Sequence, residues 1–155
     1  MKAPAPVRIV LTAMHGVGGA TCREVLNRVG FTDVVEVAEQ FEPDPDFPTV
    51  AFPNPEEPGA LDLALAKARE VEADLVIAND PDADRCSAAV PDADAPGGWR
   101  QLTGDEVGAL LGEQAAELAA FAGNGILACS VVSSRLLRRI AQSHGLNYQD
   151  RKSVV

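Results

Sequence analysis

The chain has 155 residues, of which 46% are hydrophobic and 23% are charged, so it is long enough for one ordinary domain or for parts of two. Its apolar content is sufficient for a folded core. Its net charge of −10, without a cluster of Lys and Arg, argues against a nucleic-acid partner bound through the phosphate backbone.

Three cysteines are present, odd in number and widely spaced, which fits neither a disulfide framework nor a zinc site. No segment has the length and hydrophobicity of a signal peptide or a membrane span. We therefore expect a protein of the reducing cytoplasm that has no membrane partner.

The first forty residues are expected to form a strand, a helix and a second strand. The apolar runs 7–12 and 34–37 predict the two strands. Between them, Thr21 and Glu24 have the spacing of a capping box at the start of a helix. This helix would present one apolar stripe, formed by Cys22, Val25, Leu26 and Val29.

A glycine-rich turn, H-G-V-G-G at residues 15–19, joins the first strand to this helix. It is not a nucleotide-binding fingerprint, because the third glycine of G-x-G-x-x-G would fall on Thr21 and no G-K-[ST] follows. A tight turn from strand to helix explains the glycines. For the His15 imidazole, a hydrogen bond to the loop backbone is the structural interpretation.

The middle of the chain is expected to contain a loop, a helix, a buried strand and a hairpin. Residues 42–48 include three prolines and predict the loop, and Asn54 with a proline after it has the pattern of a helix start. The buried face of this helix would contain Leu61, Ala64, Leu65, Ala68 and Val71. The apolar run 75–78 predicts a buried parallel strand, and residues 86–90 and 99–102 predict the hairpin.

Three acidic side chains, Asp80, Asp82 and Asp84, follow the buried strand directly. Pro81 prevents the strand from simply continuing, and the alternate spacing allows one short loop to direct all three carboxylates to one point. Two carboxylates about 4 Å apart repel by roughly 4 kcal/mol at an effective dielectric of 20, so three that converge need a cation among them or exposure to water. Carboxylate oxygens are ligands for Mg²⁺ and other hard cations.

Three other interpretations of this loop can be compared with the sequence. An acidic surface turn without a metal is the simplest. A phosphatase of the haloacid-dehalogenase type also places D-x-D after a buried strand, with the first Asp as nucleophile, but usually has Thr or Val where this chain has Asp84. An EF-hand that begins at Asp80 fails, because it needs Gly at its sixth position and Glu at its twelfth, where this chain has Arg85 and Pro91.

A second domain is expected to begin at Thr103, so that the predicted domains are 1–102 and 103–155. Thr103 and Glu106 have the spacing of a capping box. The long helix that follows would carry an apolar stripe of Val107, Leu110, Leu111, Ala115, Leu118 and Ala119.

The rest of the second domain is short. Residues 126–132 predict a strand, and Ser133 or Ser134 predicts the cap of a last helix that ends at Gly145. Two helices and one strand are too few to close a sheet, so we expect this domain to be incomplete and its apolar stripes to be partly exposed.

Several of these motifs resemble the α-D-phosphohexomutases, the family of phosphoglucomutase and phosphomannomutase. D-P-D-A-D-R at 80–85 is similar to the family's D-G-D-A-D-R metal loop, with Pro81 in place of the commoner Gly. The H-G-V-G-G turn is similar to a turn of the family's second domain, and F-P-N-P-E-E-P-G-A at 52–60 is similar to its P-N-P-E segment. L-T-G-D-E at 102–106 is similar to the opening of the third domain.

The resemblance implies an α/β fold, with a mixed, mainly parallel sheet and flanking helices in a metal-binding domain II, followed by part of an α/β domain III. Asp80, Asp82 and Asp84 would hold Mg²⁺, Asp84 and Arg85 would lie near the phosphate, and His15 would lie near the rim of the active site. For Arg85, an ion pair that only fixes the acidic loop is the alternative. The intact enzyme would interconvert hexose 1-phosphate and hexose 6-phosphate through a phosphoserine and a bisphosphorylated intermediate.

Other motifs of the family are missing from the sequence. It contains no T-A-S-H-N-P segment, whose serine carries the phosphate, no G-E-x-S-G sugar loop and no R-x-S-G-T phosphate loop. Residues 151–155 also depart from the family pattern. We therefore expect a fragment of a phosphohexomutase without activity of its own, with a non-catalytic metal-binding module as the alternative.

Overall fold

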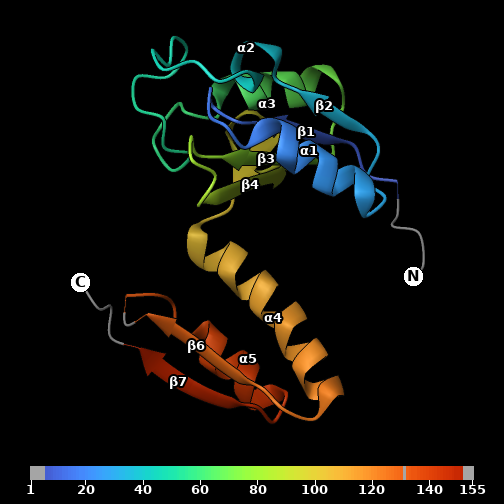
Figure 1. Ribbon diagram of the computed structural model, residues 1–155, viewed down its shortest axis with the longest axis vertical. Coiled ribbons are helices and arrows are strands. Elements are labelled where there is room, and N and C mark those ends of the chain that lie inside the picture. The colour runs from blue at the N-terminus through green and yellow to red at the C-terminus, as the bar shows by residue number, and fades with distance from the viewer. Residues whose placement is uncertain (1–5, 131, 152–155) are drawn as a thin grey trace. The chain divides into compact units, whose positions relative to one another are not determined.

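The structure is a computed structural model that describes residues 6–130 and 132–151. Val131 of the expected strand 126–132 and residues 152–155 of the expected divergent tail lie outside the described residues. The chain divides into two compact units, Met1–Leu102 and Thr103–Val155, each with its own sheet (Figure 1).

The first unit is built on a five-stranded sheet in the order β2-β1-β3-β4-β5. Its strands are β1 (Ile9–Thr12), β2 (Val34–Glu36), β3 (Leu75–Asn79), β4 (Cys86–Pro91) and β5 (Trp99–Gln101). β1 pairs in parallel with β2 and β3, whereas β4 is antiparallel to both of its neighbours. Four strands therefore run in one direction, which confirms the mixed, mainly parallel sheet and the predicted hairpin.

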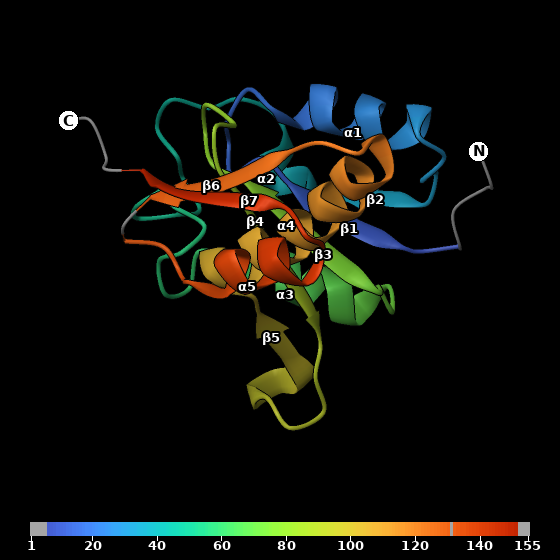
Figure 2. The same cartoon turned by 90° about the horizontal axis from the view of Figure 1, so that it is seen from below.

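Helices cover both faces of this sheet (Figure 2). α1 (Gly19–Arg28) lies on one side and α3 (Asp62–Glu70) on the other, while α2 (Ala38–Phe41) is a single turn after β2. A 3₁₀ turn, η1 (Pro96–Gly98), precedes β5. The core brings together Val10, Val37, Ala64, Ala68, Ala73, Val76, Ala89 and Trp99.

α1 begins at Gly19, two residues before Thr21, so the capping box predicted from Thr21 and Glu24 is wrong. No side chain caps the helix. Close packing determines its start, because a Cβ atom on Gly19 would lie 3.0 Å from the Phe41 ring. The predicted apolar stripe is only partly covered, since its Val25 is 54% exposed.

α3 begins at Asp62 and not at Asn54, so the predicted helix start is also wrong. Asn54 Oδ1 accepts the backbone N–H of Glu56 at 3.1 Å, which makes a local turn. Gly59 then has a φ of +83°, a left-handed conformation that interrupts a helix. The predicted buried face is largely confirmed, with Leu61, Ala64 and Ala68 buried.

The second unit contains α4 (Gly104–Ala122), β6 (Ile126–Ser130), α5 (Leu136–Ser143) and β7 (Asn147–Arg151). The capping box of α4 is confirmed, since the Thr103 hydroxyl accepts the N–H of Glu106 and the Glu106 carboxylate accepts the N–H of Thr103. β6 and β7 form a parallel pair. β7 is a strand that the sequence did not predict, because its polar residues lack an apolar alternation.

The two helices of this unit pack closely. A Cβ atom on Gly112 of α4 would lie 2.3 Å from Leu137 Cδ1 of α5, so no side chain fits there. α5 has Arg135 as its N-cap residue and no side-chain cap, so the prediction that Ser133 or Ser134 caps it is wrong. Ser134 Oγ accepts the N–H of Leu136 at 3.1 Å and makes a local turn just before the helix. Among the described residues, no helix is long and apolar enough to cross a membrane.

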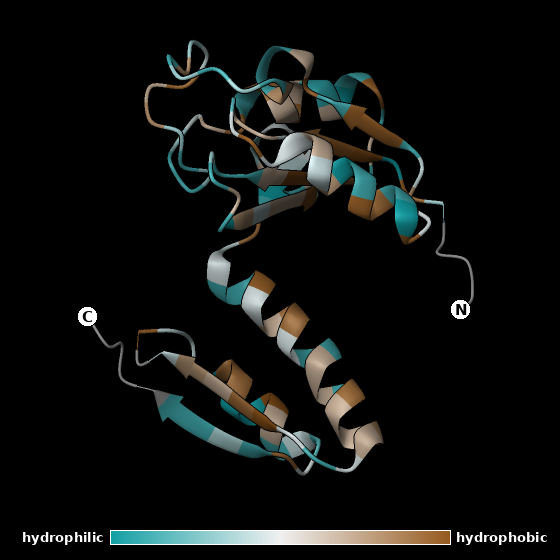
Figure 3. Ribbon diagram, viewed as in Figure 1, coloured by the Kyte–Doolittle hydropathy of each residue, from teal (hydrophilic) through white to brown (hydrophobic). Residues whose placement is uncertain are grey.

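α4 carries apolar residues along its length, which appear as brown bands (Figure 3). Its buried residues are Gly112 and Ala116, both small. The large side chains Leu110, Leu111 and Leu118 are more than 60% exposed. The expectation of partly exposed apolar stripes is therefore confirmed.

Candidate metal centre

The acidic loop 80–85 connects β3 to β4, and the glycine-rich turn follows β1. β1 and β3 are adjacent and parallel, so the segments that follow them meet at one edge of the sheet. In open α/β sheets this edge, at the carboxyl ends of the strands, is where ligands bind.

The glycine-rich turn lies directly against the acidic loop. The N–H of Val17 donates to the carbonyl of Pro81 at 2.8 Å. A Cβ atom on Gly16 would lie 2.3 Å from Pro81 Cα, and one on Gly18 would lie 2.6 Å from Ala83 Cβ. The glycines are therefore required by the close approach of the loop, beyond the tight turn that the sequence indicated.

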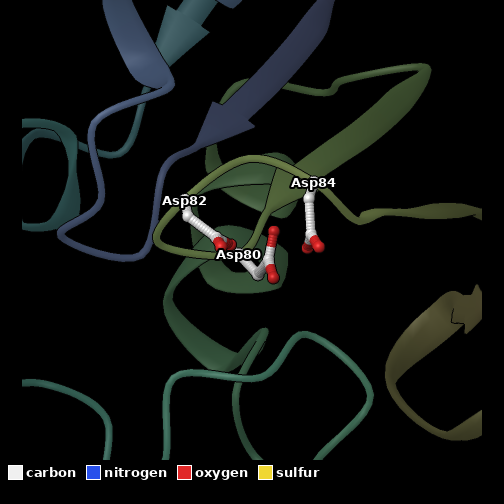
Figure 4. Close-up of side chains that lie close together, drawn as sticks. All are labelled: Asp80, Asp82 and Asp84. Atoms are coloured by element: carbon white, nitrogen blue, oxygen red, sulfur yellow. The ribbon is translucent and has the colours of Figure 1, made fainter. Parts of the chain in front are cut away.

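The structure brings the three predicted ligands together (Figure 4). Asp80, Asp82 and Asp84 each offer a carboxylate oxygen, and these oxygens lie within 4.8 Å of one another. Asp80 is 1% exposed, whereas Asp82 and Asp84 are open to solvent. Among the residues that the structure describes, no other group of three His, Cys, Asp or Glu side chains is so arranged.

This donor set fits a hard cation. Two oxygens that share one Mg²⁺ ion lie at most about 4.2 Å apart, twice the Mg–O distance of about 2.1 Å. Small rotations of the exposed Asp82 and Asp84 side chains would therefore bring the three oxygens close enough to share one ion. All donors are carboxylate oxygens, which suits Mg²⁺ or Mn²⁺ better than zinc or copper.

Arg85 is tied to the most buried of the three acids. Its backbone N–H donates to Asp80 Oδ1 at 2.9 Å, and its side-chain Nε donates to Asp80 Oδ2 at 2.8 Å. Nε also lies 3.5 Å from Asp84 Oδ1. Arg85 therefore fixes the loop, and with its side chain 57% exposed it is also accessible to an anionic ligand.

The carboxylates differ in their affinity for protons. Burial raises the pKa of Asp80, but the hydrogen bonds from the backbone and side chain of Arg85 outweigh it, so this pKa lies below its ordinary value. The hydrogen-bonding contact with Asp80, followed by the charge of Asp82, raises the pKa of Asp84. The loop thus holds negative charge that a bound cation would stabilise.

His15 is buried in the turn and does not bond the loop backbone, so that interpretation is wrong. Its Nε2 lies 2.8 Å from Thr49 Oγ1, and its ring meets Phe47 edge-on. Gln40 Nε2 also donates to Thr49 Oγ1 at 2.9 Å. This contact could not be predicted, because polar residues so far apart in the sequence carry no shared pattern.

The second D-x-D, at Asp92 and Asp94, lies in the turn between β4 and β5 and does not join the cluster. Asp92 Oδ2 lies 3.4 Å from Arg100 Nε, and Asp92 Oδ1 accepts the N–H of Asp94 at 3.0 Å. These acids therefore belong to the turn and not to the metal centre.

Comparison with protein families matches residues 1–97 to the family described as phosphoglucomutase/phosphomannomutase, alpha/beta/alpha domain II. A probable phosphomannomutase of Haemophilus influenzae is 48% identical over 151 residues, which cover 96% of this chain and 30% of that protein. A phosphoribomutase of Saccharomyces cerevisiae is 43% identical over 152 residues, which cover 91% of this chain and 24% of that protein. The chain therefore spans less than a third of the length of these relatives.

Solved structures show the same fold. A phosphoglucomutase/phosphomannomutase family protein of Burkholderia thailandensis superposes with a TM-score of 0.79 at 23% sequence identity. The superposition covers 99% of this chain and 31% of that protein. Both units of the chain therefore have counterparts in that structure.

Proposed function

Because this chain belongs to the phosphoglucomutase/phosphomannomutase family, we propose that residues 1–102 are the metal-binding domain II of a sugar phosphomutase. Residues 103–155 would be the opening part of its domain III. The observation that carries the proposal is the convergence of Asp80, Asp82 and Asp84 on one loop of the matched domain.

In this proposal the three carboxylates hold Mg²⁺. When bound, the ion supplies positive charge against the oxygens of a phosphoryl group during transfer. Asp80 is the fixed member, since it is buried and held by Arg85. Asp82 and Asp84 are exposed and can adjust to the ion.

Arg85 serves both the loop and the substrate. Its Nε holds Asp80, while the exposed part of its guanidinium can donate to a phosphoryl oxygen. A guanidinium stays charged at every physiological pH and can donate two parallel bonds, which an ammonium group cannot do. His15 supports the rim of this site from the adjoining turn and is not a base, because its Nε2 is engaged with Thr49.

The intact enzyme would interconvert a sugar 1-phosphate and the isomer that carries the phosphate on the last carbon of the sugar. The transfer would pass through a phosphoserine that this chain does not contain. A hexose is the first candidate, because the phosphomannomutase of Haemophilus influenzae is 48% identical. A pentose is a second candidate, because the yeast phosphoribomutase is 43% identical over nearly the same residues.

The family match does not favour a haloacid-dehalogenase type of phosphatase. The geometry gives a further reason, because both oxygens of Asp80 accept bonds from Arg85, and an attack on phosphorus would require one of these bonds to break. Each oxygen has a second lone pair, so the same carboxylate can still ligate a cation.

The cellular compartment and the binding partner of the protein are also part of the proposal. All three cysteines are free, which suits the reducing cytoplasm. The net charge of −10 argues against a nucleic acid as the partner. A small phosphorylated sugar would be bound through the metal.

Metal binding by the isolated chain tests this proposal. We expect Mn²⁺ or Mg²⁺ to bind weakly to the wild type in titration calorimetry, because no phosphate completes the coordination shell. Asp82→Asn should weaken binding about tenfold or more, since it removes one charged ligand.

Asp94→Asn is the matched control, because it removes the same charge from the other D-x-D. It should bind the ion as the wild type does. Equal binding by the wild type and Asp82→Asn would remove the loop as the metal site.

A further inference from the structure

A chain of hydrogen bonds begins at Met14 and ends at His15, where the glycine-rich turn starts. This turn contacts the acidic loop 80–85, which is called the metal loop below. The N–H of Met14 donates to Thr12 Oγ1 at 3.1 Å, and the hydroxyl of Thr12 donates to Gln40 Oε1 at 2.7 Å. Gln40 Nε2 donates to Thr49 Oγ1 at 2.9 Å, and Thr49 Oγ1 lies 2.8 Å from His15 Nε2. We call these five residues the polar chain.

The polar chain stabilises a backbone conformation that non-glycine residues rarely adopt. Met14 and His15 have φ angles of +50° and +62°. Such residues keep this conformation only where their surroundings determine it by several contacts at once. Two backbone bonds add to the polar chain, because the N–H of His15 donates to Gln40 O at 2.8 Å and the carbonyl of His15 accepts from Asp44 at 2.9 Å.

Three members of the polar chain are buried, since Thr12, Gln40 and His15 are at most 4% exposed. Thr49 closes the polar chain from the surface, where its hydroxyl contacts both Gln40 and His15. Gln40 is the central member, because its side chain bonds Thr12 and Thr49 while its backbone carbonyl bonds His15. The loss of one bond would leave other buried polar groups without a partner.

The conformation of the turn decides where the metal loop lies. His15 is followed directly by Gly16 and Val17. Gly16 packs against Pro81 without space for a side chain, and the N–H of Val17 donates to the carbonyl of Pro81 at 2.8 Å. A change in the turn would therefore move Pro81, which lies between the ligands Asp80 and Asp82.

We propose that Gln40 and Thr49 are positioning residues for the metal loop, acting through His15 and the Val17–Pro81 hydrogen bond. This inference rests on the proposed function only in taking the loop to bind a metal. Neither residue belongs to the acidic loop, and Thr49 is separated from Asp80 by thirty-one positions in the sequence.

Thr49→Val tests the inference, because it removes the hydroxyl but keeps nearly the same shape, and Thr49 lies at the surface, where the fold tolerates change. We expect its affinity for Mn²⁺ to be about three- to tenfold below that of the wild type. Thr49→Ser keeps the hydroxyl and should restore the affinity.

Ser87→Ala is the matched control, since it removes a buried hydroxyl near the start of β4 that accepts from Gln101 at 2.9 Å and is not part of the polar chain. It should lower stability without changing Mn²⁺ affinity. Unchanged affinity in Thr49→Val, or an equal loss in Ser87→Ala, would overturn the inference.

A second measurement does not depend on the metal. In metal-free protein, the amide hydrogen of Val17 should exchange roughly tenfold faster in Thr49→Val than in the wild type, and Thr49→Ser should reverse this. If the wild type does not bind Mn²⁺ but the exchange responds, the metal proposal fails and the positioning role stands. If the exchange does not respond, the positioning role fails whatever the metal does.

Discussion

Asp80 and Arg85 are joined by a backbone hydrogen bond, from Asp80 N–H to the Arg85 carbonyl at 3.3 Å, and by two bonds to the Asp80 carboxylate, one from the backbone N–H of Arg85 at 2.9 Å and one from its Nε at 2.8 Å. The last two bonds hold both oxygens of a carboxylate that is 1% exposed. The first and last residues of the loop are thereby fixed to each other, and the two other acids project from a closed turn.

The first prediction concerns the stability of this turn. Asp80→Asn should destabilise the metal-free protein by about 2 kcal/mol, because bonds to a charged acceptor are worth roughly 1.5–3 kcal/mol and an amide offers only one acceptor oxygen. The substitution also removes the charge repulsion between Asp80 and the exposed Asp82 and Asp84. This gain is smaller than the loss of the hydrogen bonds, since water and salt screen the repulsion.

Thermal unfolding in EDTA measures this, with an expected fall in Tm of roughly 10 °C. Asp94→Asn should change Tm little. An Asp80→Asn protein as stable as the wild type would show that repulsion within the loop cancels the bonds.

The second prediction is a pH dependence of the same contribution. The pKa of Asp80 in the folded protein lies below its ordinary value, so the ionised form favours the fold. This stability is fully present above about pH 5 and is lost as pH falls below about 4, toward the pKa of the folded state. Urea unfolding in EDTA should therefore separate wild type from Asp80→Asn at pH 6, and the difference in the free energy of unfolding should narrow as pH falls below about 4. A constant separation would contradict the argument.

The third prediction concerns Arg85. A lysine would keep the backbone N–H bond but lose the Nε bond, so Arg85→Lys should lower Tm by a few degrees, about half the effect of Asp80→Asn. In the intact enzyme kcat should also fall, by about tenfold, because an ammonium group cannot make the paired bonds of a guanidinium to a phosphoryl group.

Arg100→Lys is the matched control, since Arg100 Nε lies 3.4 Å from a carboxylate in the neighbouring hairpin. It should not affect kcat. A fall in Tm with normal turnover in Arg85→Lys would assign Arg85 to the loop alone.

The acidic loop could be found from the sequence because its ligands are separated by one residue each and follow an apolar run. Such a signal is local, so the strand that precedes the loop and the loop itself are confirmed together. The contact of Gly16 with Pro81 could not be found in this way, because it depends on the parallel pairing of β1 and β3. The polar chain is also nonlocal, since Thr12 and Gln40 are joined across twenty-eight residues.

Helix starts show the same division between local and nonlocal causes. The capping box of Thr103 is confirmed, and both of its hydrogen bonds join residues within the first turn of α4, so the signal is local. At Thr21 the same pattern is overridden, since the close packing of Gly19 on Phe41 starts the helix earlier. β7 was missed because its pairing with β6, and not its own composition, makes it a strand.

The fourth prediction follows from the uncovered side of α4. Leu118 is 67% exposed and Phe121 is 96% exposed, although both are large and apolar. Exposed apolar patches favour association, so the chain should self-associate at micromolar concentration and above. The double variant Leu118→Gln and Phe121→Gln should remain monomeric in sedimentation velocity with the same circular dichroism, and a wild type that is monomeric at all concentrations would contradict this.

The last prediction is that the chain alone has no mutase activity. Asp80, Asp82 and Asp84 can hold a cation that stabilises charge during transfer, but a metal loop supplies neither the nucleophile that carries the phosphate nor the groups that orient the sugar. Ser133 and Ser134 do not substitute for the missing serine, because the hydroxyl of Ser134 bonds the start of α5 and that of Ser133 bonds Ser130 at 2.9 Å. Incubation with glucose 1-phosphate or ribose 1-phosphate, Mg²⁺ and a sugar bisphosphate should therefore yield no isomer above a control with Asp82→Asn. Turnover with a phosphoryl group bound covalently to Asp80 would mean that Asp80 itself accepts the phosphate, and the phosphatase interpretation would have to replace the mutase proposal.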